Sequence, residues 1–316
     1  MYDVVLLSMV EPDDGCCGDD SCGDGHTKQS PAPRTPVLHC VDALRAAGAR
    51  VQTVVACSDA EVDAVLAQLD GPPRADGLTW PDSNGKTRLV VAVTDDGQLR
   101  HVLRRMVRRY APAPSKRPED LASGRTVPDL PAVAVLPLDA TAKDLAGQLG
   151  LPRQPAEVAA AVLGDTVRRL DLLRHDGGSV TLDGVLVGGA DADGRPAQWL
   201  GRVEVDDLLL TDGADPLLAV AVANAAGVAR AGGLPLLNSA DPADGVIEVA
   251  VAVPVTHKPM FGRARLRIEV RRARGRAVSV TPRDAEVPLV DDSVAGSLNR
   301  KRSWWVEPGA WAVYTG

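Results

Sequence analysis

Residues 88–109 read RLVVAVTDDGQLRHVLRRMVRR and join an apolar run to an amphipathic segment through a short polar turn. Residues 89–93 are continuously apolar and rich in β-branched side chains, which is typical of a strand buried on both faces of an α/β sheet. After the turn Thr94-Asp95-Asp96-Gly97, apolar side chains recur at helical spacing from Leu99 onward, with arginines largely on the opposite side. A strand, a sharp turn and a helix N-terminus commonly bind phosphate, because unpaired backbone N–H groups and the helix dipole point there. The sequence therefore predicts an α/β domain with a candidate anion site at this turn.

Composition limits the broad class of the protein. The chain has 316 residues, enough for two domains with separate cores, and 45% of them are hydrophobic but only 3% aromatic. Its formal net charge of −7 argues against general nucleic-acid binding. No apolar run approaches the length that spans a bilayer, and the first residues show no basic leader followed by a cleavage pattern. We expect a cytoplasmic protein.

The pattern of elements changes near residue 176. Before it, predicted strands and helices alternate, which indicates a mostly parallel sheet covered on both faces; one helix is predicted over residues 140–149. From there to about residue 290, Gly- and Asp-punctuated short strands, including one over 216–223, indicate an antiparallel β-sandwich. We predict a doubly wound α/β domain over 1–173, a β-sandwich over 174–299, and a terminal strand within 300–316 that returns to the first domain.

Several motifs in the second half, taken in order, resemble a known family. Residues 224–251 read NAAGVARAGGLPLLNSADPADGVIEVAV, and VTPRDAEVPL (280–289) precedes RSWWVEPGAWAVY (302–314). These segments resemble the Asn, Gly-Gly and Asp-Gly pattern, the Asp-Gly-Glu motif and the closing Pro-Gly strand of the diacylglycerol kinase and sphingosine kinase catalytic family, which includes bacterial lipid kinases. The resemblance implies a kinase-like α/β domain plus a β-sandwich, and ATP- and Mg²⁺-dependent phosphoryl transfer to a lipid hydroxyl. Nucleotide and lipid are then the substrates.

The first half departs from that family at its nucleotide motifs. The turn stands where the family has Gly-Gly-Asp-Gly-Thr: Asp96 and Gly97 are retained, Thr94 and Asp95 replace the glycines, and Gln98 replaces the threonine. Glycines let the backbone approach phosphate without a Cβ, and Asp95 adds negative charge beside a polyanion. VLPLDATAKDLAGQLGLP (135–152) stands where the family has Gly-Thr-x-Asn-Asp, and the family's Asn-Pro-x-Ser-Gly loop after the first strand is missing.

The resemblance implies roles for particular residues. The implied nucleotide-binding residues are Thr94, Asp95, Asp96, Gly97, Gln98, Thr141, Asp144 and Asp171. Asp284 is the implied base for the attacking hydroxyl, together with Glu286. Asp241, Asp244 and the Val246 carbonyl match the family's Mg²⁺ site, since oxygen ligands suit a hard cation. The simpler interpretation of the last group is that Asp-Pro and Asp-Gly form turns.

An acidic loop over residues 11–26, EPDDGCCGDDSCGDGH, brings Cys16, Cys17 and Cys22 close together in sequence, followed by His26. Three thiolates suit a soft ion or Zn²⁺, with the histidine as a fourth zinc ligand. The Cys-Cys-x₄-Cys spacing also resembles the arsenic metallochaperone family, which implies binding of As(III). The alternatives are a flexible acidic loop with incidental cysteines, or a redox disulfide.

Arginines alternate with apolar residues over 263–268 and continue through Arg271, Arg272, Arg274 and Arg276. In a lipid kinase this patch implies peripheral contact with anionic headgroups, whereas the simpler interpretation is a solvated face of a β-sheet.

Two functional hypotheses follow. In the first, the chain is an ATP-dependent lipid kinase. In the second, it is a catalytically degenerate relative that acts as a non-enzymatic regulatory or metal/metalloid-binding protein through Cys16, Cys17 and Cys22. The eroded nucleotide motifs and the retained β-domain motifs are the pattern that lost or altered catalysis would leave.

Overall fold

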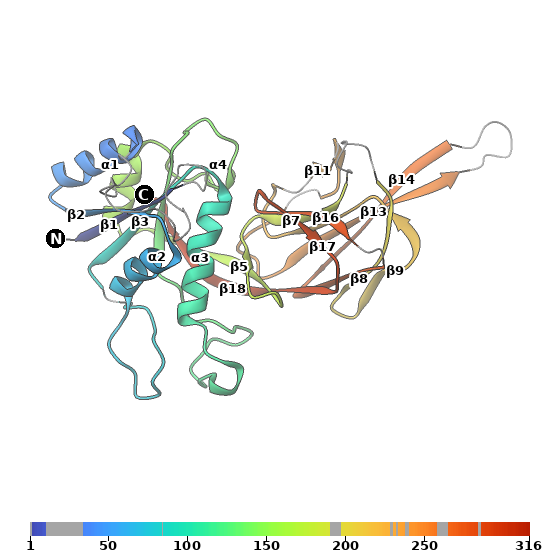
Figure 1. Ribbon diagram of the computed structural model, residues 1–316, viewed down its shortest axis with the longest axis horizontal. Helices are drawn as coiled ribbons and strands as arrows, with labels where there is room; N and C mark the ends of the chain where they lie inside the picture. The colour runs from blue at the N-terminus through green and yellow to red at the C-terminus, as the bar shows by residue number, and fades with distance from the viewer. Residues whose placement is uncertain are drawn as a thin grey trace, which may run out of the picture. The chain divides into compact units, whose positions relative to one another are not determined.

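The computed structural model describes residues 2–10, 34–83, 85–189, 197–227, 230–231, 233–237, 240–257, 265–283 and 286–316. The chain forms two compact units (Figure 1). Unit 1 comprises Met1–Ala122, Thr126–Arg169 and Trp311–Gly316, and unit 2 comprises Ser123–Arg125 and Leu170–Ala310. The predicted ligand residues Cys16, Cys17 and Cys22 and the predicted base Asp284 lie outside the described residues.

Unit 1 is built on a parallel sheet of the order β2-β1-β3-β4, continued by the end of β18. Its strands are β1 (Asp3–Met9), β2 (Arg50–Ala56), β3 (Thr87–Val93), β4 (Ala132–Pro137) and the last residues of β18 (Arg302–Tyr314). The middle strands β1, β3 and β4 are mostly apolar because both of their faces are covered.

Helices lie on both faces of this sheet. They are α1 (Thr35–Ala46), α2 (Asp59–Leu66), α3 (Asp96–Tyr110), α4 (Leu145–Gln148) and α5 (Pro155–Leu163), with short 3₁₀ turns at η2 (Ala67–Leu69) and η3 (Pro114–Lys116). The apolar sides of α1 and α5 share one core cluster with alternate residues of β1, β3 and β4. On the other face, α2 and α3 contact each other and the same sheet. The predicted doubly wound α/β architecture is confirmed.

Helix α3 is tied to its neighbour by charge as well as by burial. Its apolar side, from Leu99 to Tyr110, is buried. On its other side the guanidinium of Arg105 pairs with Asp63, and that of Arg109 pairs with Asp70. These two arginines therefore join α3 to α2 and the segment after it, rather than only facing solvent.

Unit 2 is a β-sandwich. One sheet has the order β18-β15-β8-β9, with β5 paired to β18 and β6 paired to β5, and the other has the order β14-β13-β10-β7-β16-β17. The first contains β5 (Val167–His175), β6 (Val180–Thr181), β8 (Trp199–Val205), β9 (Leu208–Leu217) and β15 (Ala277–Pro282). The second contains β7 (Gly184–Gly188), β10 (Ala219–Ala223), β13 (Ile247–His257), β14 (Arg265–Gly275), β16 (Val287–Asp291) and β17 (Val294–Leu298). A two-stranded ribbon, β11 (Arg230–Ala231) and β12 (Leu234–Pro235), completes the unit.

Side chains from both sheets of unit 2 form one core cluster, which includes Val203, Val280 and Trp304 from the first sheet and Val220 and Val251 from the second. The predicted sandwich is confirmed. The single strand predicted over 216–223 is wrong, because the chain changes sheets at Leu218: β9 pairs with β8, whereas β10 pairs with β7 and β13.

None of the helices in the described ranges is long and apolar enough to cross a membrane.

A buried arginine holds the returning strand in unit 1. Arg88, on β3, is 8% exposed. Its guanidinium lies 3.5 Å from the ring centre of Tyr2 and 5.3 Å from that of Tyr314, which ends β18. It donates hydrogen bonds to the carbonyls of Val162 (2.5 Å) and Gly164. One buried cation therefore connects the first residues, the end of α5 and the last strand.

We expect Arg88→Met to lower the free energy of unfolding by about 3 kcal/mol, because buried carbonyls lose a charged donor. Urea unfolding of the full chain, followed by circular dichroism, measures this. The matched control is Arg50→Met, since the Arg50 side chain is 68% exposed and its ion pair with Asp3 is worth less than about 1 kcal/mol. Equal losses of unfolding free energy in the two variants would contradict a stabilising role for the buried Arg88.

Candidate functional site

The turn after β3 uses its own side chains to bond its backbone N–H groups. Asp95 is the N-cap of α3, and its carboxylate accepts a hydrogen bond from the N–H of Gln98 at 3.0 Å. The side-chain carbonyl of Gln98 accepts one from the N–H of Thr94, also at 3.0 Å. Two N–H groups of the predicted phosphate site are thus bonded within the turn, and a carboxylate stands at the helix N-terminus, where a phosphate would bind.

The next residue of the turn connects it to the second predicted nucleotide segment. Asp96 is 9% exposed, and both of its carboxylate oxygens accept a hydrogen bond from the N–H of Leu145, at 3.0 and 3.1 Å. Leu145 begins α4, whose N-cap Asp144 accepts a hydrogen bond from the N–H of Gly147 at 2.8 Å. The structure therefore brings the turn Thr94–Gln98 and the segment around Asp144 together.

Residues 139–144 form a loop, so the helix predicted over 140–149 is wrong in its first half. The carboxylate of Asp139 accepts hydrogen bonds from the N–H and hydroxyl of Thr141, at 2.8 and 2.7 Å. The Thr141 hydroxyl bond is the main reason that the pKa of Asp139 lies below its usual range. Asp139 thus bonds nearby backbone in place of a helix, and Asp144, as the N-cap, sets the start of α4 at Leu145. The hydroxyl of Thr141, a predicted nucleotide contact, is engaged within the loop.

Arg153 organises this loop and was missed by the sequence analysis. Its guanidinium pairs with Asp144 and donates hydrogen bonds to the carbonyls of Ala140 and Ala142, both at 2.8 Å. The local sequence does not indicate this role, because α4 and the glycine turn after it separate Arg153 from the loop in the chain.

In unit 2 a buried carboxylate joins three of the predicted segments. Asp171, on β5, is 1% exposed, and its carboxylate accepts hydrogen bonds from the N–H groups of Gly245 (2.6 Å) and Gly309 (2.7 Å). Both glycines have positive φ angles, +74° and +58°, which suit glycine. Burial raises the pKa of Asp171 above its ordinary value, although the two N–H bonds oppose this. The carboxylate therefore bonds β5 to the turn at Asp244 and to Gly309 of β18.

Asn224, the first residue of the motif at 224–251, lies beside this carboxylate-bearing strand. It is 1% exposed, and its side-chain amide donates to the carbonyls of Asp171 (2.9 Å) and Leu182 (2.8 Å). Its Oδ1 has no donor among the described residues. Asn224 is therefore a buried connector between β5 and the segment after β6.

The two carboxylates predicted to bind Mg²⁺ are used within their own turn. Asp241 accepts from the N–H of Ala243 at 3.0 Å, and Asp244 accepts from the N–H of Val246 at 3.1 Å. The other oxygen of Asp244 pairs with Arg274. Across the part of the chain that the structure describes, no group of three or more His, Cys, Asp or Glu side chains could hold a metal ion.

The remaining predicted site residues are placed less closely. Glu286 is exposed and immediately precedes β16. In the predicted arginine patch, Arg271 pairs with Glu269 and Asp215, and Arg272 donates to the carbonyl of Leu236 at 2.7 Å. Much of that positive charge is already engaged, and membrane contact stays a prediction.

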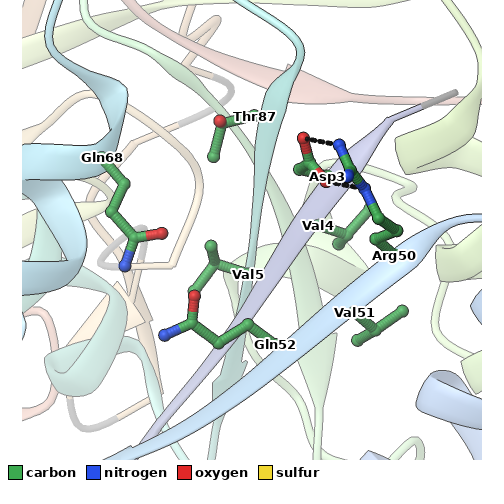
Figure 2. Close-up of a pocket in the computed structure, with 8 residues that line it drawn as sticks. All are labelled: Asp3, Val4, Val5, Arg50, Val51, Gln52, Gln68 and Thr87. Atoms are coloured by element: carbon green, nitrogen blue, oxygen red, sulfur yellow. Dashed lines mark hydrogen bonds and ion pairs between the residues drawn. The ribbon is translucent and has the colours of Figure 1, made fainter.

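A pocket of about 350 Å³ opens at the other end of the parallel strands (Figure 2). It is lined by Asp3, Val4, Val5, Arg50, Val51, Gln52, Gln68 and Thr87. Three of these residues begin β1, β2 and β3, whereas Thr94 follows the carboxyl end of β3. Ligands of open α/β sheets bind outside the carboxyl ends of the strands, so this pocket is not the predicted nucleotide site.

Comparison with known proteins supports the fold. No family model matches the chain, and no curated protein matches it. The chain is similar to the crystal structure of a diacylglycerol kinase from Bacillus anthracis str. Sterne, with a TM-score of 0.59 and 13% identity. The match covers 100% of this chain and 97% of the kinase chain. Two further structures from the same organism, each 14% identical, cover the same shares of both chains with TM-scores of 0.60 and 0.61. The fold is that of a diacylglycerol kinase, as the motifs predicted.

We expect Asp171→Asn to lower the free energy of unfolding by about 1–3 kcal/mol, because an amide nitrogen would face one of the two glycine N–H groups. Urea unfolding of the full chain measures this, with Asp207→Asn in the exposed turn after β8 as the control. An unchanged midpoint for Asp171→Asn would contradict the joining role.

The same pair of proteins tests the raised pKa of Asp171. A raised folded pKa means that the folded state holds the proton more tightly, so this carboxyl contributes most to stability below its unfolded pKa of about 3.9. The contribution decreases as pH rises through the folded pKa. The difference in unfolding free energy between wild type and Asp171→Asn should therefore be larger at pH 4 than at pH 7.

Proposed function

We propose that this chain is a lipid kinase-like protein that has lost ATP-dependent phosphoryl transfer and acts as a non-enzymatic regulatory or metal/metalloid-binding protein. The observation that carries the proposal is that side chains of the turn at Thr94–Gln98 accept hydrogen bonds from the turn's own backbone N–H groups. There the Asp95 carboxylate caps α3, and the Gln98 side chain bonds the N–H of Thr94.

The physical argument concerns charge at one place. A helix N-terminus attracts a phosphate through its unpaired N–H groups and its dipole. Here the Asp95 carboxylate accepts one of those N–H bonds and lies at the positive end of the same dipole. Two like charges about 4 Å apart near a protein surface repel by about 4 kcal/mol. A repulsion of that size weakens binding on the order of a thousandfold. Asp95 therefore opposes a nucleotide phosphate at this turn in addition to accepting the N–H of Gln98.

The ligand of a non-enzymatic protein is suggested by the sequence. Cys16, Cys17 and Cys22 provide three thiolates within seven residues, which suit Zn²⁺ or As(III). The carboxylates of the same stretch of sequence favour a bound cation over a bare thiolate nucleophile.

A second candidate is ATP- and Mg²⁺-dependent phosphoryl transfer to a lipid hydroxyl. The similarity of fold along the whole chain and the meeting of three motif segments at Asp171 favour it. In this candidate Thr94–Gln98, Thr141, Asp144 and Asp171 bind the nucleotide. Asp284 acts as the base beside Glu286, and Mg²⁺ would neutralise charge on the transferred phosphoryl group.

Titration calorimetry of reduced full-length protein with ATP and Mg²⁺ separates the two candidates. We expect no binding by the wild type at millimolar nucleotide. The variant Thr94→Gly/Asp95→Gly/Gln98→Thr, which restores the glycines and removes the added charge, should bind at least tenfold more tightly.

The control is Gln98→Ala, which frees the N–H of Thr94 but keeps the Asp95 carboxylate. If Asp95 is the main obstacle to nucleotide binding, this variant still shows no binding of ATP in the titration. Micromolar binding of ATP by the wild type would overturn the loss of nucleotide binding and support the second candidate.

A parallel titration with Zn²⁺ and with arsenite tests the ion-binding part. We expect one ion per chain with micromolar or tighter affinity, lost in Cys16→Ser/Cys17→Ser/Cys22→Ser and kept in Cys57→Ser. Cys57 is the matched control because it lies just after β2, away from the loop in sequence. If the triple variant and the wild type gave identical titrations, the three cysteines would not be ligands of the ion.

A further inference from the structure

Two carboxylates of the turn at residues 241–246 bond its own backbone. The Asp241 and Asp244 carboxylates each accept a hydrogen bond from a backbone N–H two residues on. The N–H of Gly245 points the other way and bonds to Asp171. The turn therefore supplies one of the two donors that position the buried carboxylate of unit 2.

The cation beside this turn is an arginine of the neighbouring strand. Arg274 lies on β14 directly opposite Glu248 of β13 in the antiparallel register. Its guanidinium pairs with the second oxygen of Asp244, and its Nε bonds to Glu248 at 3.0 Å. The register of the two strands thus places one positive charge between two carboxylates.

These residues do not fit the magnesium ion that the resemblance implies. Mg²⁺ requires several oxygen ligands in near-octahedral geometry. Here one oxygen of Asp244 is bonded to the N–H of Val246 and the other to Arg274. Each oxygen of Asp244 already has a partner, and the guanidinium at the second oxygen, which stays protonated, repels a divalent cation there.

We propose that Arg274 is the resident cation of the turn at 241–246 and replaces a divalent metal there. Unit 2 then keeps this turn, and through Gly245 the position of Asp171, independently of magnesium. The proposal rests on contacts within unit 2 and holds whether or not the protein binds a nucleotide.

Thermal unfolding of the full chain in EDTA and in 10 mM MgCl₂, at matched ionic strength, tests this. Arg274→Ala should lower the melting temperature in EDTA by about 3 °C, because Asp244 and Glu248 both lose their paired cation. Magnesium should restore at least half of that loss in Arg274→Ala and raise the melting temperature by less in the wild type.

Two further variants locate the effect. Arg267→Ala removes an exposed arginine from the same strand and should respond to magnesium as the wild type does. Arg274→Ala/Asp244→Asn should lose the added response, because the freed carboxylate is gone. Equal magnesium responses in wild type and Arg274→Ala would overturn the proposal, as would an added response that persists in the double variant.

Discussion

The carboxylate of Asp171 accepts hydrogen bonds from two glycine N–H groups that are separated by more than sixty residues of chain. Because it is almost fully buried, removing either donor leaves a buried carboxyl oxygen without its hydrogen bond, which is costly in a protein interior. The hydrogen bonds of Asp171 therefore couple the positions of β5, the turn at Asp244 and the Gly309 segment of β18. Arg88 has the corresponding role in unit 1, where one buried cation is shared by the N-terminal residues, the end of α5 and the returning strand.

A second feature occurs at several sites: charged side chains of this chain lie at the positions where the resemblance implies a bound ligand. Asp95 stands at the N-terminus of α3, where the resemblance implies a phosphate. Asp144 caps α4 and is itself paired with Arg153. Arg274 lies on Asp244, where the resemblance implies a metal. In each case an internal ionic group satisfies the local charge, so the scaffold keeps its shape without the ligand.

Internal satisfaction of this kind explains how a fold can persist while its chemistry changes. Burial of apolar strands and helix faces stabilises the two units, and it depends on hydrophobic pattern rather than on the identity of turn residues. The turns that would contact nucleotide or metal are then free to change, provided that their backbone groups find other partners. Asp95 and Gln98 show this directly, since the side chain of each accepts a hydrogen bond from a backbone N–H of the turn.

Hydrophobic periodicity alone was enough to predict the doubly wound first unit, the sandwich and the strand–turn–helix at residues 88–109. These depend on which faces are apolar, and the sequence displays that directly. It also identified Asp96, Asp144, Asp171 and Gly245 as parts of motifs, but not that Asp96 bonds Leu145 or that Asp171 bonds Gly245 and Gly309. The break at Leu218 was missed because it depends on which strands pair, and the loop at 139–144 was missed because its conformation depends on hydrogen bonds from Arg153. Hydrogen bonds and ion pairs between distant residues require the strands to be in register, and only the tertiary structure brings those partners within 3 Å of each other.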